Sequence, residues 1–288
     1  MRAIRDFFSS NGYIEVETPC RIPAPAPEAH IDAPASGDWF LRSSPELCMK
    51  RLLAAGFPRI FQICKCFREK ERGDLHTPEF TILEWYTKDA DYMDMMAQTE
   101  EMIRAAAKGA GISGNRIVRR GATIDIAPPW PRITVADAFE QFASITVEEA
   151  LKRDMFDEVL TDEIEPRLGK TKPIFLCDYP ASMGSLARLR PDNPEVAERF
   201  ELYMDGMELC NAFTELTDPK EQEDRFKAEI KRRESCGKTV YPLPEKFLKD
   251  LEFMPDAAGN ALGIDRLTMI LTNAEKIDDV SAFTPEEL

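Results

Sequence analysis

The segment from Phe67 to Phe80 carries the side chains best suited to chemistry. Arg68 follows one apolar run, a charged loop comes next, and His76 precedes a second apolar run that ends at Tyr86. Two apolar runs around a polar loop predict an antiparallel pair of strands. A planar Arg can hold phosphate and carboxylate oxygens, and an aromatic ring gives a base a surface to stack on. The segment therefore predicts a site that activates a carboxylate with ATP.

The elements before and after this loop are predicted from capping and periodicity. Ser43 or Ser44, followed by acidic Glu46, indicates the start of a helix over 45–55. Proline at alternate positions over 23–27 excludes helix and central strand there. The other elements expected in this half are a helix at 2–11, a strand at 15–18 and a helix at 92–107.

In the second half, the charged helical segment 135–169 is expected to place Glu163 and Glu165 on a solvated face. A buried strand is predicted over 173–180, and a charged helix over 218–236.

Two further strands are predicted at 200–204 and 207–213, because the Asp-Gly pair at 205–206 is typical of a hairpin turn. These strands carry Glu201 and Glu208. Facing carboxylates on neighbouring strands suit Mg²⁺, which takes one or two carboxylates plus phosphate oxygens. Two exposed carboxylates in loose ion pairs are the simpler alternative.

Composition limits the class of protein. The 288 residues carry a net charge of −15, which argues against a large electrostatic footprint on nucleic acid. No apolar stretch is long enough to span a bilayer or to resemble a signal peptide, so a cytoplasmic protein is expected. The seven cysteines show no metal pattern, Cys64 and Cys66 are expected on opposite faces of a strand, and reduced thiols are favoured over zinc or disulfides.

Three segments resemble, in the right order, the motifs of class II aminoacyl-tRNA synthetases. Residues 12–19 resemble motif 1, residues 67–80 motif 2, and residues 259–267, with Arg266, motif 3. The resemblance implies an α/β (α+β) fold, with a mostly antiparallel sheet flanked by helices. It also implies a single catalytic domain over 1–288 without an anticodon-binding domain, and a homodimer formed through the motif 1 region.

Other segments are similar to the lysyl members of that family, above all 199–216 and 178–181. Residues 43–46, residues 83–86 and Ala261 are more similar to the free-standing paralogues of that subgroup, which attach lysine, preferably (R)-β-lysine, to a lysine side chain of elongation factor P. The resemblance implies ATP and Mg²⁺ as cofactors and lysine or β-lysine as substrate. Elongation factor P is the expected partner, and neither tRNA nor a membrane is expected.

The resemblance gives the candidate residues their expected roles. Arg68 and Arg266 would be catalytic: Arg68 would bridge the α-phosphate and the substrate carboxylate, and Arg266 would hold the γ-phosphate. His76 would lie near the β- and γ-phosphates, and Phe80 would stack on adenine. Positioned cations stabilise the charge that develops in such transfers.

One position departs from the synthetase pattern. Lys70 stands where a Glu usually contacts the adenine amino group. Either Glu71 takes over that contact through a shifted loop, or backbone groups read the adenine edge.

A buried lysine ammonium needs compensating carboxylates. The resemblance places Glu84, Glu215 and the Tyr86 hydroxyl at the ε-amino end, and Glu46 at the α- or β-amino group. Phe213 would line the alkyl chain. The whole expected substrate-binding set is Ser44, Glu46, Glu84, Tyr86, Asn211, Phe213, Glu215 and Ala261, and the expected metal ligands are Glu201 and Glu208.

Two alternatives stay open. One is the same activation step with another acceptor: tRNA, a carrier protein or a small amine. The other is a catalytically silent paralogue that acts as a regulatory or binding subunit. The second alternative is disfavoured by the retention of Arg68, Arg266, Glu201 and Glu208, because a catalytically silent paralogue does not need these residues.

Overall fold

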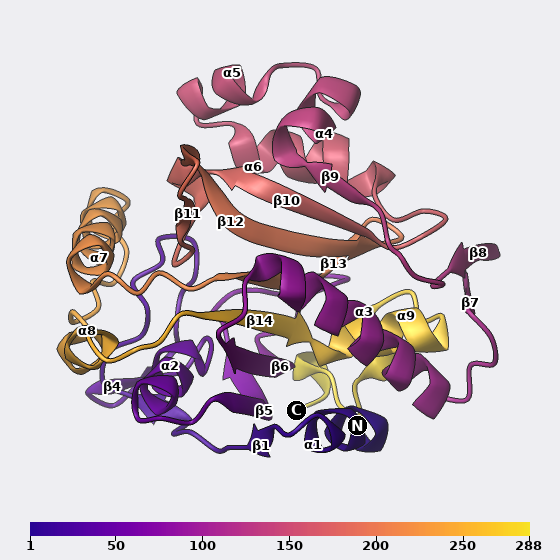
Figure 1. Cartoon of the computed structure of the whole chain (residues 1–288), viewed down its shortest axis with the longest axis horizontal. Coiled ribbons are helices and arrows are strands. Elements are labelled where there is room, and N and C mark those ends of the chain that lie inside the picture. The colour runs from indigo at the N-terminus through magenta and orange to yellow at the C-terminus, as the bar shows by residue number, and fades with distance from the viewer.

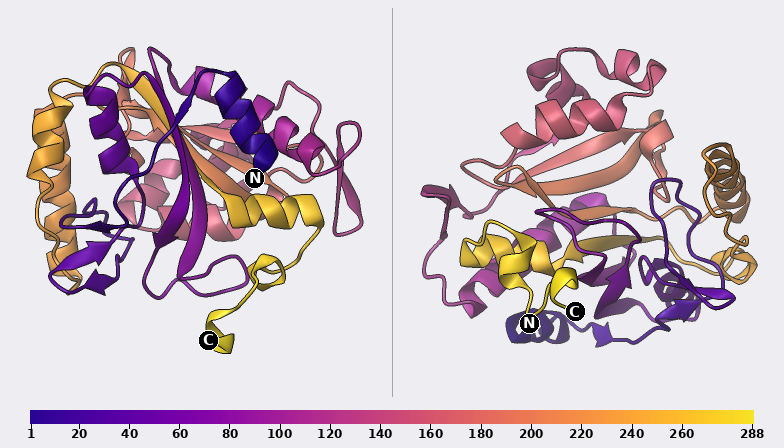
Figure 2. Two further views of the ribbon diagram at one scale, coloured as in Figure 1. Left: turned by 90° about the horizontal axis from the view of Figure 1, so that it is seen from below. Right: turned by 180° about the vertical axis from the view of Figure 1, so that it is seen from behind.

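The computed structural model describes residues 1–288 and is built around one nine-stranded sheet, seen from three sides in Figures 1 and 2. The strand order is β1-β5-β6-β14-β13-β12-β10-β9, and β11 pairs with β12. Only the pairs β1–β5 and β10–β9 are parallel, so the expected mostly antiparallel sheet is confirmed. The strands are β1 (Ile14–Glu15), β5 (Arg59–Phe67), β6 (Glu79–Lys88), β9 (Arg132–Thr134), β10 (Ile174–Pro180), β11 (Leu189–Arg190), β12 (Asn193–Met204), β13 (Met207–Thr214) and β14 (Ala257–Gly263).

Helices cover both faces of this sheet and form three apolar cores with it. On one face the core is made with α1 (Arg2–Ser10), α3 (Tyr92–Gly109) and α9 (Ile264–Thr272). On the other face, α2 (Glu46–Ala54), α7 (Pro219–Ser235) and α8 (Glu245–Leu251) form a second core. A third core joins β10 and β12 to α4 (Val135–Phe142), α5 (Val147–Lys152) and α6 (Phe156–Val159).

Alternation along the strands explains how the sheet serves two cores. Leu83 and Trp85 of β6 belong to the α1–α3–α9 core, whereas Tyr86 belongs to the core beneath α2. Successive side chains of a strand point to opposite faces, so even-numbered residues of β6 face α2. Glu84 lies on that same face.

The predicted elements are largely present, with local differences. The hairpin turn is confirmed, since Asp205 and Gly206 have φ values of 55° and 74°, as a primed turn requires. The strand expected at 15–18 is shorter, because only Ile14 and Glu15 pair in full with β5 and the chain then turns away towards Pro19. The segment 135–169 forms several short helices, helical turns included, instead of one continuous helix.

Minor elements complete the chain. A three-stranded sheet and a hairpin lie outside the central sheet: β2 (Arg21–Ile22), β3 (Ala35–Ser36), β4 (Trp39–Leu41), β7 (Arg116–Arg119) and β8 (Ala122–Asp125). None of the helices has the length and apolar character that crossing a membrane requires.

The cysteines correct one expectation. Cys64 and Cys66 are two residues apart on β5, so their side chains share a face instead of opposing each other. All seven cysteines are free thiols in the structure, and Cys20 and Cys236 are exposed.

Candidate active site

The sheet register places six of the fifteen candidate residues in two neighbouring rows across five strands, on the face between the α2 core and the α4–α6 core. Each residue of a row is the direct cross-strand partner of the next, and residues two apart on a strand share a face. The first row is Gln62, Glu84, Ala261, Asn211 and Glu201. The second row is Ile60, Tyr86, Gly259, Phe213 and Arg199.

Small residues of β14 form the floor between the two halves of this surface. A Cβ atom at Gly259 would collide with the ring of Tyr86 and the carboxylate of Glu215. The missing side chain lets these two groups approach each other across β14. Ala261 occupies the neighbouring row and adds only a methyl group.

Glu84 is a buried carboxylate with hydrogen bonds but no cationic partner. Its side chain accepts from Ser44 Oγ at 2.6 Å and from the Tyr86 hydroxyl at 3.1 Å, and the residue is 1% exposed. Ser44 Oγ also accepts from the backbone N–H of Glu46 at 2.9 Å, but the N-cap residue of α2 is Pro45, so the expected cap at Ser43 or Ser44 is wrong. Burial, reinforced by the charge of Glu46, raises the pKa of Glu84 to about 8. Such a carboxylate can receive a substrate ammonium.

The loop between β5 and β6 presents Arg68 beside an aromatic ring. The Arg68 guanidinium lies 5.1 Å from the centroid of the Phe80 ring, and its Nη1 lies 3.7 Å from Oε2 of Glu71. Its Nε is buried without a hydrogen-bond acceptor. Lys70 has a φ of 66° and an 82% exposed side chain, so Glu71, not Lys70, faces Arg68.

Arg266, in the segment that resembles motif 3, contacts His76 in the segment that resembles motif 2. From the first turn of α9 it lies 2.6 Å from His76 Nε2, and it donates to the carbonyl oxygen of Glu208 at 2.9 Å and to its Oε2 at 3.1 Å. Burial, together with the positive charge of Arg266, lowers the pKa of His76. Burial opposes the ionisation of Glu208, but Arg266 outweighs it and keeps the pKa of Glu208 below its usual value. The two Arg residues and His76 thus offer cationic and hydrogen-bonding groups to a polyphosphate.

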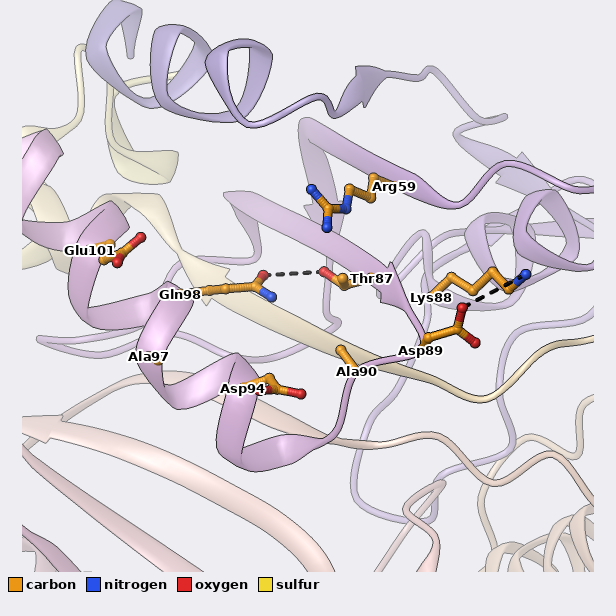
Figure 3. A pocket seen from close by; sticks show the side chains of 9 residues that line it. All are labelled: Arg59, Thr87, Lys88, Asp89, Ala90, Asp94, Ala97, Gln98 and Glu101. Carbon is orange, nitrogen blue, oxygen red and sulfur yellow. Dashed lines mark hydrogen bonds and ion pairs between the residues drawn. The ribbon is translucent and has the colours of Figure 1, made fainter.

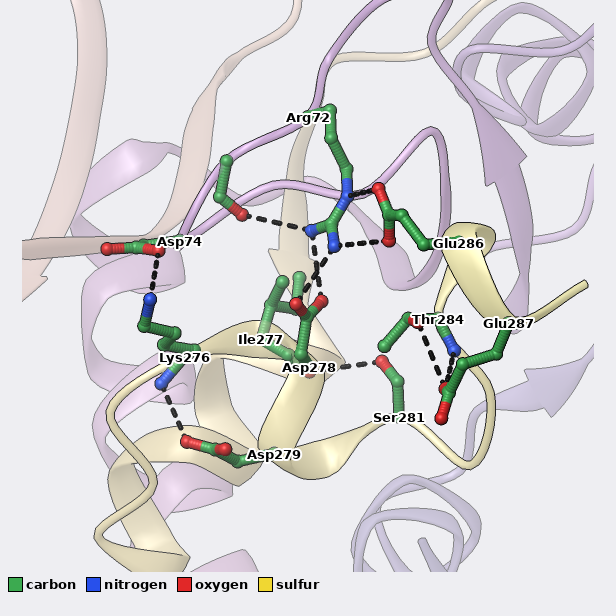
Figure 4. A network of polar contacts seen from close by, with 11 residues as sticks. Arg72, Asp74, Lys276, Ile277, Asp278, Asp279, Ser281, Thr284, Glu286 and Glu287 are labelled. Atoms are coloured by element: carbon green, nitrogen blue, oxygen red, sulfur yellow. Dashed lines mark hydrogen bonds and ion pairs between the residues drawn. The ribbon is translucent and has the colours of Figure 1, made fainter.

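The outer side of the same loop is tied to the C-terminal segment (Figure 4). Arg72 donates two hydrogen bonds of 2.9 Å to Asp278 and bonds of 2.9 Å and 2.7 Å to Glu286. Lys276 pairs with Asp74 at 3.1 Å. We call these five residues the loop clasp.

Glu201 and Glu208 lie on the neighbouring strands β12 and β13 but are not direct cross-strand partners: Glu201 is opposite Asn211 and Glu208 is opposite Tyr203, and each carboxylate is paired within the protein. Glu201 accepts bonds of 2.6 Å from Arg199, Tyr179 and Tyr203. Oε1 of Glu208 accepts no hydrogen bond, and no group of three or more metal-ligating side chains exists. This donor set fits an Mg²⁺ ion that is held by one or two carboxylates and otherwise by phosphate oxygens. Such an ion would neutralise charge on the phosphates.

Glu165 was expected on a solvated face, and that expectation is wrong. Its Oε1 lies 3.0 Å from the Tyr203 hydroxyl, which also contacts Glu201. Burial, together with the charges of Glu208 and Glu201, raises the pKa of Glu165 to about 7. The helical segment between β9 and β10 therefore contributes a carboxylate to the edge of the site.

Three residues of the site had not been singled out from the sequence. Arg199 lies two residues before Glu201, so the strand period alone places both on one face. Lys50 follows Glu46 by one helical turn and contacts its carboxylate. Glu28, in the proline-rich loop, accepts from Ser185 Oγ at 3.3 Å, and burial with the charge of Glu46 raises its pKa to about 7. Nothing periodic in the loop marks Glu28.

A second hollow lies on the opposite face of the sheet, between α3 and the ends of β5 and β6 (Figure 3). It has a volume of about 370 Å³ and includes Arg59, Thr87 and Gln98 among its lining residues. Thr87 points away from the face that carries Glu84 and Tyr86, because neighbouring strand residues face opposite sides. This hollow is therefore separate from the candidate active site.

The chain is similar to known proteins over nearly its whole length. The class II tRNA synthetase family (D, K and N) matches residues 1–287, and the chain belongs to that family. A lysine–tRNA ligase of Pelotomaculum thermopropionicum is 37% identical over 98% of this chain, which spans 61% of that relative's length. An elongation factor P–(R)-β-lysine ligase of Salmonella arizonae is 37% identical over 99% of this chain and 92% of its own length. A lysine–tRNA ligase of Dehalococcoides mccartyi is 38% identical, and the chain again spans 61% of its length.

Proposed function

We propose that the protein activates lysine or β-lysine with ATP, forming an aminoacyl-adenylate and diphosphate. The observation that carries this proposal is the convergence of Arg68, Arg266 and three buried or half-buried carboxylates on one face of the sheet. The carboxylates are Glu46, Glu84 and Glu215. A cationic end for phosphates and an anionic end for ammonium groups are what this reaction requires.

For ATP, we infer that Phe80 stacks on adenine and that Arg68 bridges the α-phosphate and the substrate carboxylate. Arg266 would bind the γ-phosphate, with His76 beside it. The contact between Glu71 and Arg68 supports Glu71 as the group nearest the adenine edge. Fixed donors aimed at developing charge are the largest contribution available to such a site.

For the amino acid, Glu84, Glu215 and the Tyr86 hydroxyl would surround the terminal ammonium, and Glu46 would receive the second ammonium. Phe213 would line the alkyl chain. The remaining members of the proposed set are Ser44, Asn211 and Ala261. Mg²⁺ would be held by Glu208 and Glu201, once Glu201 loosens its pairing with Arg199.

The proposed acceptor is a lysine side chain of elongation factor P. The net charge of −15 disfavours tRNA, whose backbone attracts basic surfaces. The relatives named for elongation factor P support the same choice. The chain would act as a single catalytic domain and as a homodimer that pairs through the motif 1 region.

The test is intact-mass analysis of elongation factor P after incubation with the protein, ATP, Mg²⁺ and either lysine or β-lysine. Arg68→Ala serves as the inactive control, and lysine-dependent ATP–pyrophosphate exchange reports the first step separately. Exchange without a mass change, together with charging of lysine tRNA, would restore the synthetase alternative. No exchange at all would support the silent paralogue.

A further inference from the structure

Lys50 places an internal ammonium group inside the proposed amino-acid pocket. It lies on α2 with a side chain only 1% exposed, and its Nζ contacts the carboxylates of Glu46 and Glu215. The same nitrogen lies 5.0 Å from the centroid of the Phe213 ring. A buried lysine is rare unless it is paired, so this position is built for a cation.

Glu215 depends on this lysine. Its side chain is fully buried, its Oε2 contacts the Lys50 ammonium, which is its one cationic partner, and its Oε1 has no hydrogen-bond donor. Burial disfavours the charged form of Lys50, but Glu215 and Glu46 outweigh it and raise the pKa of Lys50. The ammonium therefore stays charged, and one side of Glu215 stays open to a ligand donor.

The charges of the pocket then match a diamino acid. Glu46, Glu84 and Glu215 supply three negative charges when ionised, and Lys50 cancels one of them. Two remain for the two ammonium groups of lysine or β-lysine. Glu28 also interacts with the charge of Glu46, and the positive charges of Arg68 and Arg199 oppose its own charge.

We propose that Lys50 is a specificity-determining positioning residue: its ammonium cancels one carboxylate and orients Glu46 and Glu215, so that the pocket accepts a substrate with two ammonium groups. The inference rests on the proposed activation of lysine. Without Lys50, the like charges of Glu46 and Glu215 would oppose each other, and neither carboxylate would be held in its present orientation.

The experiment is a double-mutant cycle on lysine binding, measured by calorimetry, with ATP binding measured separately. Lys50→Met should weaken lysine binding at least tenfold and leave ATP binding within about threefold. Glu215→Gln alone should also weaken lysine binding. The double variant restores the charge of the pocket, so it should bind lysine at least threefold more tightly than either single variant. Lys65→Met, an exposed lysine on β5, is the matched control and should behave as wild type.

Two results would overturn the proposal: unchanged lysine affinity in Lys50→Met, or a double variant no tighter than the single variants. If Lys50→Met fails to fold, the comparison of the double variant with Glu215→Gln decides alone, because neutralising both partners of a buried pair is tolerated better than removing one. Wild-type protein that binds no lysine would refute the proposed function itself, and with it this inference.

Discussion

Glu84→Gln is the sharpest single test of the amino-acid pocket. The substitution keeps the shape of the side chain and removes one formal charge that is 1% exposed and has no cationic partner. Removing one member of a buried charge pair costs about 3–5 kcal/mol. Because burial raises the pKa of Glu84 to about 8, ionising it at pH 7 already costs about 1 kcal/mol. The net loss of lysine binding should be about 2–4 kcal/mol, or roughly 30- to 900-fold.

Calorimetry with lysine and, separately, with ATP gives the comparison. Wild-type lysine affinity should rise from pH 6 towards pH 8, since the ammonium binds the ionised carboxylate and the raised pKa leaves Glu84 mostly protonated below about 8. Glu84→Gln should reduce this rise and leave ATP affinity unchanged; part of the rise should persist, because burial also raises the pKa of Glu215 to about 8. Glu79→Gln, an exposed carboxylate on the same strand, is the matched control. Unchanged lysine affinity in Glu84→Gln, or an equal loss of ATP affinity, would refute the assignment of this pocket.

Three further outcomes are expected. Arg68→Ala and Arg266→Ala should each lower lysine-dependent ATP–pyrophosphate exchange at least about 100-fold, because charge-assisted contacts to phosphate are lost. The circular dichroism spectrum should not change. Normal exchange in either variant would contradict the proposed active site. Gly259→Ala should destabilise the fold by about 1–3 kcal/mol in thermal melting, since the added Cβ collides with Tyr86 and Glu215; an unchanged melting temperature contradicts that packing. Transfer to elongation factor P should accelerate above neutral pH while exchange changes less, because the attacking amine must be neutral; parallel pH profiles contradict this order of steps.

Local patterns were sufficient to predict the parts of the site that one stretch of chain builds. The strand–loop–strand around Arg68 and the hairpin carrying Glu201 follow from apolar runs and turn residues, and both are present. The grouping of distant segments came from resemblance, because no local pattern reveals that Glu84 and Asn211 lie on either side of Ala261.

The residues that sequence reasoning missed depend on tertiary packing. The sequence shows that Lys50 follows Glu46 by four positions on a predicted helix. It does not show the contact of Lys50 with Glu215, which is far away in the chain. Glu165 looked solvated because its neighbours are charged, yet the packing of the helical segment against β12 turns it towards Tyr203. The pattern of hydrophobic residues does not predict that a charged side chain faces inwards.

The ion pairs of the loop clasp should be more sensitive to salt than the ion pairs around Lys50. Arg72 and its partners lie at the surface, where added salt screens their attraction, whereas the buried pairs around Lys50 are shielded from ions. Rising ionic strength should therefore release the proposed nucleotide-binding loop before it disturbs the proposed amino-acid pocket. Buffers chosen for nucleotide titrations need a fixed salt concentration, and a tag fused at Leu288 would sit two residues from Glu286, within reach of the clasp.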